Sequence, residues 1–226
     1  MFDKRPPCPG DPNDYIWVKS KERPHWRRKR GKVSPARLNE AWQASNNKTS
    51  IVSPAASRVR RMIEPYLRGI TAGRLNNRIS SAFRRSLKAC GQMQLKYLKA
   101  MECQRDYPLD ALLRSDYRVR VNEKNIRIEI PVGSRSMKAH NTLVSDYYFE
   151  AVLLYGDAGK EKGLDTMSTE SRLYSYYEES GQMCVLTLPF PQDDWCLFLK
   201  VCSLEGKELA VHTKHYRMKV VAARED

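Results

Sequence analysis

The chain has 226 residues, of which 41% are hydrophobic, and it carries 40 lysines and arginines against 26 aspartates and glutamates. That hydrophobic share is enough for a folded core and excludes a fully disordered chain. No apolar run approaches about 18 residues, and no apolar stretch follows the first charges. The sequence therefore predicts neither a membrane-spanning helix nor a secretory signal.

The excess positive charge lies in the N-terminal half. Residues 1–105 contain 24 basic and 7 acidic side chains, a net charge of +17, whereas residues 106–226 contain 16 and 19, a net charge of −3. Apolar residues recur at helical spacing before residue 105 and alternate after residue 115. We expect an α+β fold: an extended Pro/Arg-rich arm (1–33), a basic helical region (34–106) and an antiparallel β-sandwich (107–226).

Prolines define the arm. They exclude a continuous helix before residue 33 and lie at Pro6, Pro7, Pro9, Pro12 and Pro24. Within the arm, the apolar and aromatic run over residues 15–18 predicts a short strand that needs a partner. The cation-rich run over residues 23–32 follows it and is typical of an interaction tail.

Two Ser-Pro pairs predict helix starts, with serine as N-cap and proline in the first turn. Ser34-Pro35 predicts a short helix to about Gln43, followed by a loop over residues 45–50. Ser53-Pro54 predicts the next helix, which Pro65 kinks or ends. Its apolar face comprises Val59, Met62, Ile63, Tyr66 and Leu67.

A longer helix is predicted from about Leu75 to Gln104, weakened in its middle by Gly91, at a cost of about 1 kcal/mol relative to alanine. Its buried stripe comprises Leu75, Ile79, Phe83, Leu87 and Cys90. A second face gathers Arg74, Arg78, Arg85 and Lys88 and is suited to following a nucleic-acid backbone.

Beyond Pro108 the pattern predicts six to eight short strands with regular turns, which is typical of an antiparallel sandwich or barrel. The predicted strands cover residues 117–121, 126–130, 147–155, 172–178, 183–188, 195–203, 207–216 and 217–222. Residues 122–125 form a hairpin loop, and residues 156–163 form a turn-rich connection.

The six cysteines form no C-x-x-C pair. Cys184, Cys196 and Cys202 lie in apolar strand contexts, which favours free buried thiols over a disulfide framework. His212 and His215 form the sole local histidine pair, and on a strand their rings would point to opposite faces. We therefore expect no metal site.

No catalytic motif is present. The glycine-rich stretch over residues 156–160 lacks the spacing of a phosphate-binding loop, and the S-x-x-K form over residues 45–48 has no partner motifs. G-x-S-x-G and H-E-x-x-H are absent. We expect a non-enzyme without a cofactor.

The basic arm allows three interpretations, and the plainest of them is a solvated arginine face. Trp26 lies among cations, an arrangement suited to base stacking beside phosphates; these cations are Arg23, Arg27, Arg28, Lys29 and Arg30. No helix-turn-helix, zinc finger or RNP motif accompanies them. Alternatively, the arm adds its strand to a sheet edge of a neighbouring copy, whose acidic β domain attracts its arginines.

Four segments resemble an uncharacterised protein family abundant in Bacteroidota. They are residues 31–37 (GKVSPAR), 74–79 (RLNNRI), 113–121 and 195–211. The chain departs from the family at its front, where a Pro-rich leader replaces a Gly-rich opening, and its β domain lacks a G-F-E-F run. The resemblance implies a basic helical half followed by a β domain, and a non-enzyme.

Our leading hypothesis is a structural subunit that self-assembles into a fibre, filament or virion-like assembly, as a homo-oligomer or homopolymer. The arm would dock on neighbouring subunits through Tyr15, Ile16, Trp17, Val18, Trp26 and Trp42. The alternative is a nucleic-acid-binding protein. The missing signal predicts cytoplasmic synthesis, with release into an extracellular assembly as one outcome.

Overall fold

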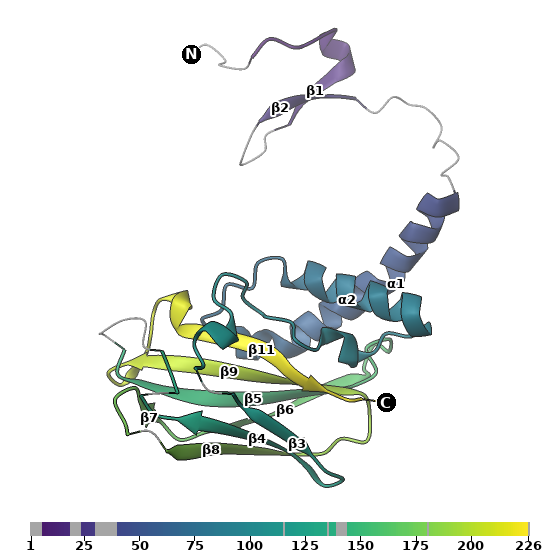
Figure 1. Cartoon of the computed structure of the whole chain (residues 1–226). Coiled ribbons are helices and arrows are strands. Elements are labelled where there is room, and N and C mark those ends of the chain that lie inside the picture. Colours follow the sequence, from purple (N-terminus) through teal and green to yellow (C-terminus); the bar gives the residue numbers. More distant parts are fainter. Residues whose placement is uncertain are drawn as a thin grey trace. The chain divides into compact units, whose positions relative to one another are not determined.

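The computed structural model divides into two compact units, Met1–Ser45 and Asn46–Asp226, which are described separately (Figure 1). The structure describes residues 6–18, 24–29, 40–114, 116–134, 136–138, 144–179 and 181–225, with the side chains of residues 40–42 left out.

The first unit contains a β-hairpin. A short 3₁₀ turn, η1 (Pro12–Asp14), leads into β1 (Tyr15–Val18), which pairs antiparallel with β2 (His25–Arg28). Trp17 and Trp26 lie directly opposite each other, with ring centroids 5.2 Å apart in an edge-to-face arrangement. The strand predicted over residues 15–18 is confirmed, and its partner is part of the cation-rich run expected to be a tail.

The second unit begins within the first helix, at Asn46, and its first elements are helical. α1 spans Glu40–Ile63 and continues into η2 (Glu64–Leu67); α2 spans Leu75–Cys90 and is followed by η3 (Leu95–Leu98). α1 buries a stripe at helical spacing made of Val52, Ala55, Ala56, Val59 and Ile63. α2 buries Leu75, Ile79, Ala82 and Phe83 in the same way.

A large antiparallel sheet lies under these helices. Its centre is β5 (Asp146–Gly156) paired with β9 (Trp195–Glu205). β6 (Leu164–Glu170) and the short β7 (Tyr174–Ser175) extend it beside β5, while β10 (Glu208–Leu209) and β11 (Tyr216–Ala223) extend it beside β9.

A small antiparallel sheet packs on the opposite face of the large one, and its strand order is β3 (Arg118–Val121), β4 (Asn125–Val132), β8 (Gln182–Pro189). Two 3₁₀ turns complete the second unit, η4 (Leu109–Ala111) and η5 (Thr213–His215).

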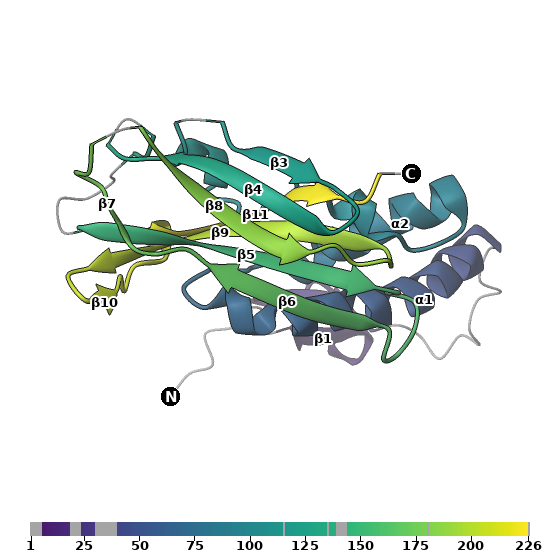
Figure 2. The ribbon, with the colours of Figure 1, turned by 90° about the horizontal axis from the view of Figure 1, so that it is seen from below.

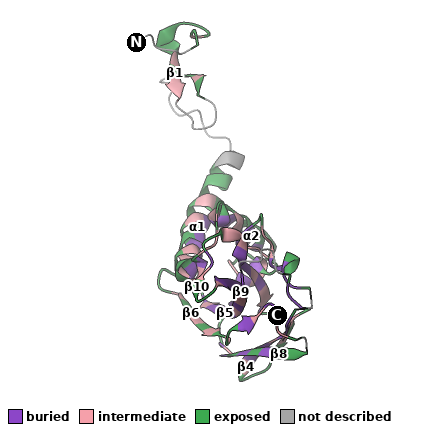
Figure 3. Ribbon diagram, turned by 90° about the vertical axis from the view of Figure 1, so that its left-hand side faces the viewer, coloured by how far each residue is buried: buried purple, intermediate pink, exposed green. Residues whose placement is uncertain are grey.

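The large sheet separates two hydrophobic cores (Figures 1 and 2). Along β5, Phe149 and Leu153 face the small sheet, whereas Val152 and Leu154 face the helices. Figure 3 shows buried residues concentrated between these layers, with exposed residues on the outer sides of the helices and of the small sheet. The second unit is therefore a β-sandwich with a helical layer on one sheet, and the predicted α+β class is confirmed.

The predicted helix boundaries are wrong in two places. Residues 45–50 lie inside α1, and Pro54 is within that helix rather than at its start. A proline inside a helix removes one backbone hydrogen bond. Burial of the apolar stripe that begins at Val52 stabilises the helix on both sides of Pro54. α2 ends at Gly91, whose φ of +73° caps it, so Gly91 terminates the helix instead of weakening its middle.

The strand predictions hold for β3, β4, β5, β8, β9 and β11 within a few residues. β6 was missed, because its sequence, LDTMSTE, has only two apolar side chains, Leu164 and Met167, among five polar ones. The strands predicted over residues 172–178 and 207–216 shrink to two-residue pairings, β7 and β10. No helix within the described ranges is long and apolar enough to cross a membrane.

Candidate nucleic-acid interface

The helical layer, defined as residues 46–105, concentrates positive charge. It contains 13 lysines and arginines and 2 acidic residues, a net charge of +11, while residues 106–226 have a net charge of −3. The apolar stripes of α1 and α2 face the large sheet, so the polar side of each helix faces outward. The exposed cations of the layer are Lys48, Arg61, Arg68, Arg74, Arg84, Arg85, Lys88, Lys99 and Arg105.

The predicted basic face of α2 is only partly exposed. Arg74, Arg85 and Lys88 are exposed, whereas Arg78 is half-buried and donates hydrogen bonds to the backbone carbonyls of Glu102 and Cys103. Burial lowers the pKa of Arg78. Arg78 therefore joins α2 to the following segment, and the other three cations face solvent.

A hollow of about 260 Å³ lies between α2 and the segment after η3. Its polar lining comprises Arg78, Ser81, Arg85, Tyr97 and Lys99, and no carboxylate lines it. One liquid water occupies about 30 Å³, so the hollow has room for a phosphate group. The positive net charge of the layer and a recess lined by its cations therefore occur at the same place.

One carboxyl at the inner edge of the layer has an unusual proton affinity. Glu102 accepts a hydrogen bond from the Leu109 amide (3.1 Å), and its carboxylate lies 4.0 Å from Lys219 Nζ. Burial raises the pKa of Glu102 to about 7, although the amide and Lys219 both favour the ionised form. Near neutral pH this group titrates, which makes the net charge of the layer pH-dependent.

The arm residues have separate positions. Arg27, Arg28 and Lys29 are exposed on or beside β2, and Arg23 and Arg30 lie outside the described residues. Trp26 is half-buried, and its indole Nε1 donates to the Pro6 carbonyl at 2.8 Å. Trp26 and the cations Arg27 and Arg28 therefore lie on one strand of the hairpin.

The predicted anchors lie on the two faces of that hairpin. Side chains alternate along a strand, so Tyr15 and Trp17 share one face and Ile16 and Val18 share the other. Ile16 is 37% exposed. Trp42 lies in α1, and its side chain is not among those described.

The cysteine and histidine predictions have clear outcomes. All six cysteines are free, and Cys184, Cys196 and Cys202 are buried as expected. His212 and His215 lie at η5 rather than on a strand, with ring centroids 6.2 Å apart. Within the described ranges, no group of three His, Cys, Asp or Glu side chains is placed to hold a metal ion.

A buried ion pair between the two central strands of the large sheet was not predicted from the sequence. Glu150 on β5 lies opposite Lys200 on β9, with Oε2 and Nζ 3.0 Å apart and the side chains 9% and 6% exposed. They adjoin a small cavity of about 160 Å³ lined in part by Arg68 and Glu170. The sequence signal was a single charged residue within each of two apolar strands, negative in one strand and positive in the other.

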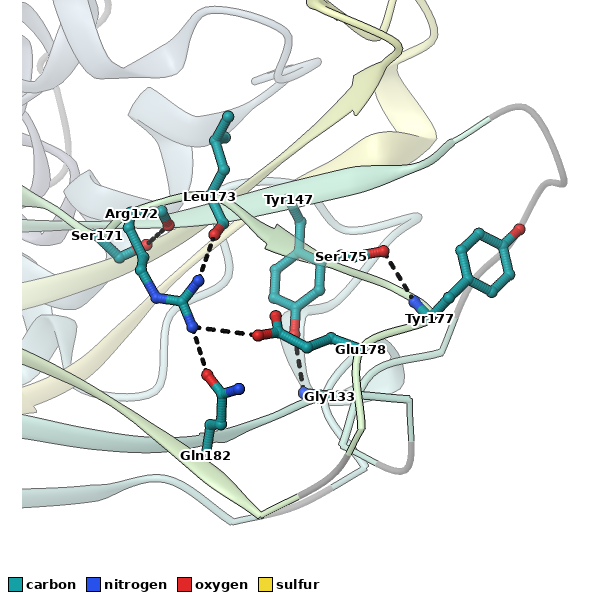
Figure 4. A network of polar contacts seen from close by, with 9 residues as sticks. All are labelled: Gly133, Tyr147, Ser171, Arg172, Leu173, Ser175, Tyr177, Glu178 and Gln182. Carbon is teal, nitrogen blue, oxygen red and sulfur yellow. Dashed lines mark hydrogen bonds and ion pairs between the residues drawn. The ribbon is translucent and has the colours of Figure 1, made fainter.

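A polar network at one end of the sandwich was also missed (Figure 4). Arg172 lies 3.2 Å from the Glu178 carboxylate, donates to the Gln182 side chain and stacks over the Tyr174 ring at 4.4 Å. The guanidinium lowers the pKa of Glu178. These contacts link the segment around β7 to the first residue of β8.

Comparisons with known proteins found no matching family model, no matching curated protein and no matching solved structure.

Proposed function

We propose that this protein binds nucleic acid, with the helical layer as its electrostatic surface. The observation that carries the proposal is the ratio of 13 cations to 2 carboxylates in residues 46–105. A protein surface that needs only to be soluble usually carries positive and negative charges side by side. A surface with almost only positive charges attracts a polyanion.

The way the layer is held supports this proposal. Its apolar side is occupied by the core beneath it, which includes Phe198 and Val220 from the large sheet. The exposed cations therefore stay on one side of a fixed framework, and their repulsion is relieved when phosphates replace bulk counterions. The exposed Arg27, Arg28 and Lys29 of the hairpin add further phosphate contacts.

The test is the salt dependence of binding. A labelled 30-nucleotide duplex or single strand is titrated with the full chain by fluorescence anisotropy from 50 to 300 mM salt. The triple variant Arg74→Ala/Arg85→Ala/Lys88→Ala removes three exposed cations of α2. For a duplex, each lost phosphate contact reduces the slope of log K against log salt by about 0.9, so we expect a slope flatter by about 2.7.

A matched control removes the same charge from the sheets. Lys124→Ala/Lys160→Ala/Lys162→Ala takes away three exposed cations in loops of the sandwich, and we expect the native slope. Absence of binding at 50 mM salt, or an equal effect of both triple variants, would rule out the helical layer as the binding surface.

A specific observation supports a second candidate, the self-assembling structural subunit. A two-stranded hairpin is marginally stable alone in water, and this one exposes Ile16 on the face opposite its tryptophan pair. In this proposal the hairpin docks on a neighbouring copy. The charge argument for that docking is weaker than the sequence suggested, because +11 of the +17 belongs to the layer fixed on the β-sandwich.

Deletion of residues 1–33 separates the two functions. Under the assembly proposal, the truncated chain stays folded and no longer forms large species by sizing chromatography and negative-stain microscopy. Unchanged assembly after deletion contradicts arm docking, and it leaves nucleic-acid binding by the helical layer to its own test.

A further inference from the structure

β8 is an edge strand without charge. It forms the border of the small sheet, and among the described strands only β4 pairs with it. Its eight residues, QMCVLTLP, include no charged side chain, and Met183 and Val185 are 54% and 41% exposed. Edge strands in soluble proteins usually carry charges, bulges or covering segments that prevent pairing with another chain.

The hydrogen-bond pattern shows which backbone groups of β8 face outward. The Phe190 amide donates to the Lys124 carbonyl at 3.0 Å, and antiparallel ladders alternate between bonded and non-bonded pairs. With the β4–β8 register, the amides and carbonyls of Leu188, Leu186 and Cys184 therefore face β4. Those of the alternate residues, Met183, Val185 and Thr187, face away from the sheet.

The other long edges are protected. β3 carries Arg118 and Arg120, and β6 carries Asp165 and Glu170. The outer edge of β11 is covered by residues 100–103, since the Cys103 amide donates to the Met218 carbonyl at 2.7 Å and two further backbone bonds join Val220. Among these edges, β8 alone has no charged side chain, and β4 is its one paired strand among the described residues.

We propose that two copies of this chain dimerise by antiparallel pairing of β8 with β8, with Val185 on the twofold axis. In this register Val185 faces Val185 of the second copy, and Met183 faces its Thr187. The three outward-facing residues of each copy then exchange about six backbone hydrogen bonds. The two small sheets become one continuous sheet.

A second copy fits this edge better than a charged partner does. An edge that pairs with itself about a twofold axis brings like residues together, which repels charged side chains and favours neutral ones. Apolar and β-branched side chains such as valine and methionine suit these cross-strand positions. Arg172 donates to the Gln182 side chain, which links the first residue of β8 to the segment before β7 (Figure 4).

The test uses charge at the axis. Val185→Lys and Val185→Asp each place like charges opposite one another, so we expect each variant to be monomeric at concentrations where the native chain is a dimer. An equimolar mixture of the two should recover the dimer, because lysine then faces aspartate. The measurement is sedimentation velocity on full-length, nuclease-treated protein at 300 mM salt, from 1 to 100 µM.

Matched variants keep the result specific. Ser168→Lys adds the same charge to the exposed edge of β6 and should leave the dimer intact. Thr187→Pro removes an outward amide without breaking the ladder to β4, and should weaken dimerisation at least tenfold. Circular dichroism confirms that each variant is folded.

Three results overturn the proposal. The native chain is monomeric at 100 µM, or the lysine and aspartate variants do not recover a dimer on mixing, or deletion of residues 1–33 abolishes the dimer while Val185→Lys does not. The last result assigns the contact to the hairpin. Nucleic-acid binding by the helical layer is measured separately, and none of these three results decides whether it occurs.

Discussion

The buried pair of Glu150 and Lys200 gives the largest single-residue effect that we expect in this fold. Their charged atoms are 3.0 Å apart, and both side chains are more than nine-tenths buried. Lys200→Met keeps most of the length of the side chain and removes its charge, so the Glu150 carboxylate is left in the interior without its partner. Breaking a buried pair in this way costs about 3–5 kcal/mol.

The cost depends on pH, because an unpaired buried carboxylate takes up a proton. Protonation removes the unpaired buried charge, so the penalty applies where the carboxylate is ionised and falls as pH falls. The deficit of Lys200→Met relative to the native chain should therefore be small near pH 4 and full at pH 8.

Urea unfolding followed by tryptophan fluorescence measures the effect, as a lower midpoint at an unchanged slope. The double variant Glu150→Leu/Lys200→Met removes both charges and should lie within about 1 kcal/mol of the native chain or above it. Lys160→Met serves as a control, since Lys160 lies 3.6 Å from Asp157 with both side chains exposed. A loss below about 1 kcal/mol for Lys200→Met would refute the argument from burial.

Three further outcomes are expected. Because burial raises the pKa of Glu102 to about 7 in the folded state, stability is lost as pH rises from about 4.5 through 7. Glu102→Gln should remove this pH dependence of stability, which is worth at most about 3 kcal/mol. Thermal melts between pH 5 and 8 measure it. Gly69→Ala should cost about 1–3 kcal/mol, because φ is +79° and a Cβ would lie 2.5 Å from a tyrosine ring, while Gly73→Ala, where a Cβ meets nothing within 4 Å, should be close to neutral in the same melts. In the folded protein, a thiol reagent should react quickly with exposed Cys90, more slowly with half-buried Cys8 and with the other four only on unfolding; rapid reaction of all six would contradict the buried positions.

The strands were the most predictable part of the fold. Alternation over residues 117–121 and 126–130 identified β3 and β4 and the loop between them, because a half-buried strand imposes a period of two on its side chains. β9 was found as a continuous apolar run, since both of its faces are covered. The sequence contains no comparable signal for which strand pairs with which.

The helical errors have a tertiary origin. Apolar spacing continues past Gly91 through Leu95 and Leu98, which extended the predicted helix to residue 104. In the structure the chain reverses there, and Ser86 accepts the Gln94 amide and donates to the Gln92 carbonyl. Such contacts depend on the position of the turn and leave no periodic pattern.

The candidate site was half predictable. Sequence composition located the positive charge but assigned it to a domain separate from the β domain, because composition does not reveal that α1 and α2 share a core with the large sheet. Arg78 illustrates the difference, since spacing placed it with Arg74 and Arg85, and its hydrogen bonds turn it inward. The ion pair of Glu150 with Lys200 required the β5–β9 register, which only the structure provides.

The large sheet that separates the two cores has a consequence for biosynthesis. The stripe of α1 that includes Val52 and Val59 packs in one core with Phe198 and with Met218 of β11, more than a hundred residues later in the chain. On the ribosome, the N-terminal helices therefore emerge long before the strands that cover them. Until those strands are made, the apolar faces of the helices are exposed to solvent. Contacts of such long sequence separation form slowly. We expect the nascent helical layer to need a chaperone or a bound polyanion until β11 has been made.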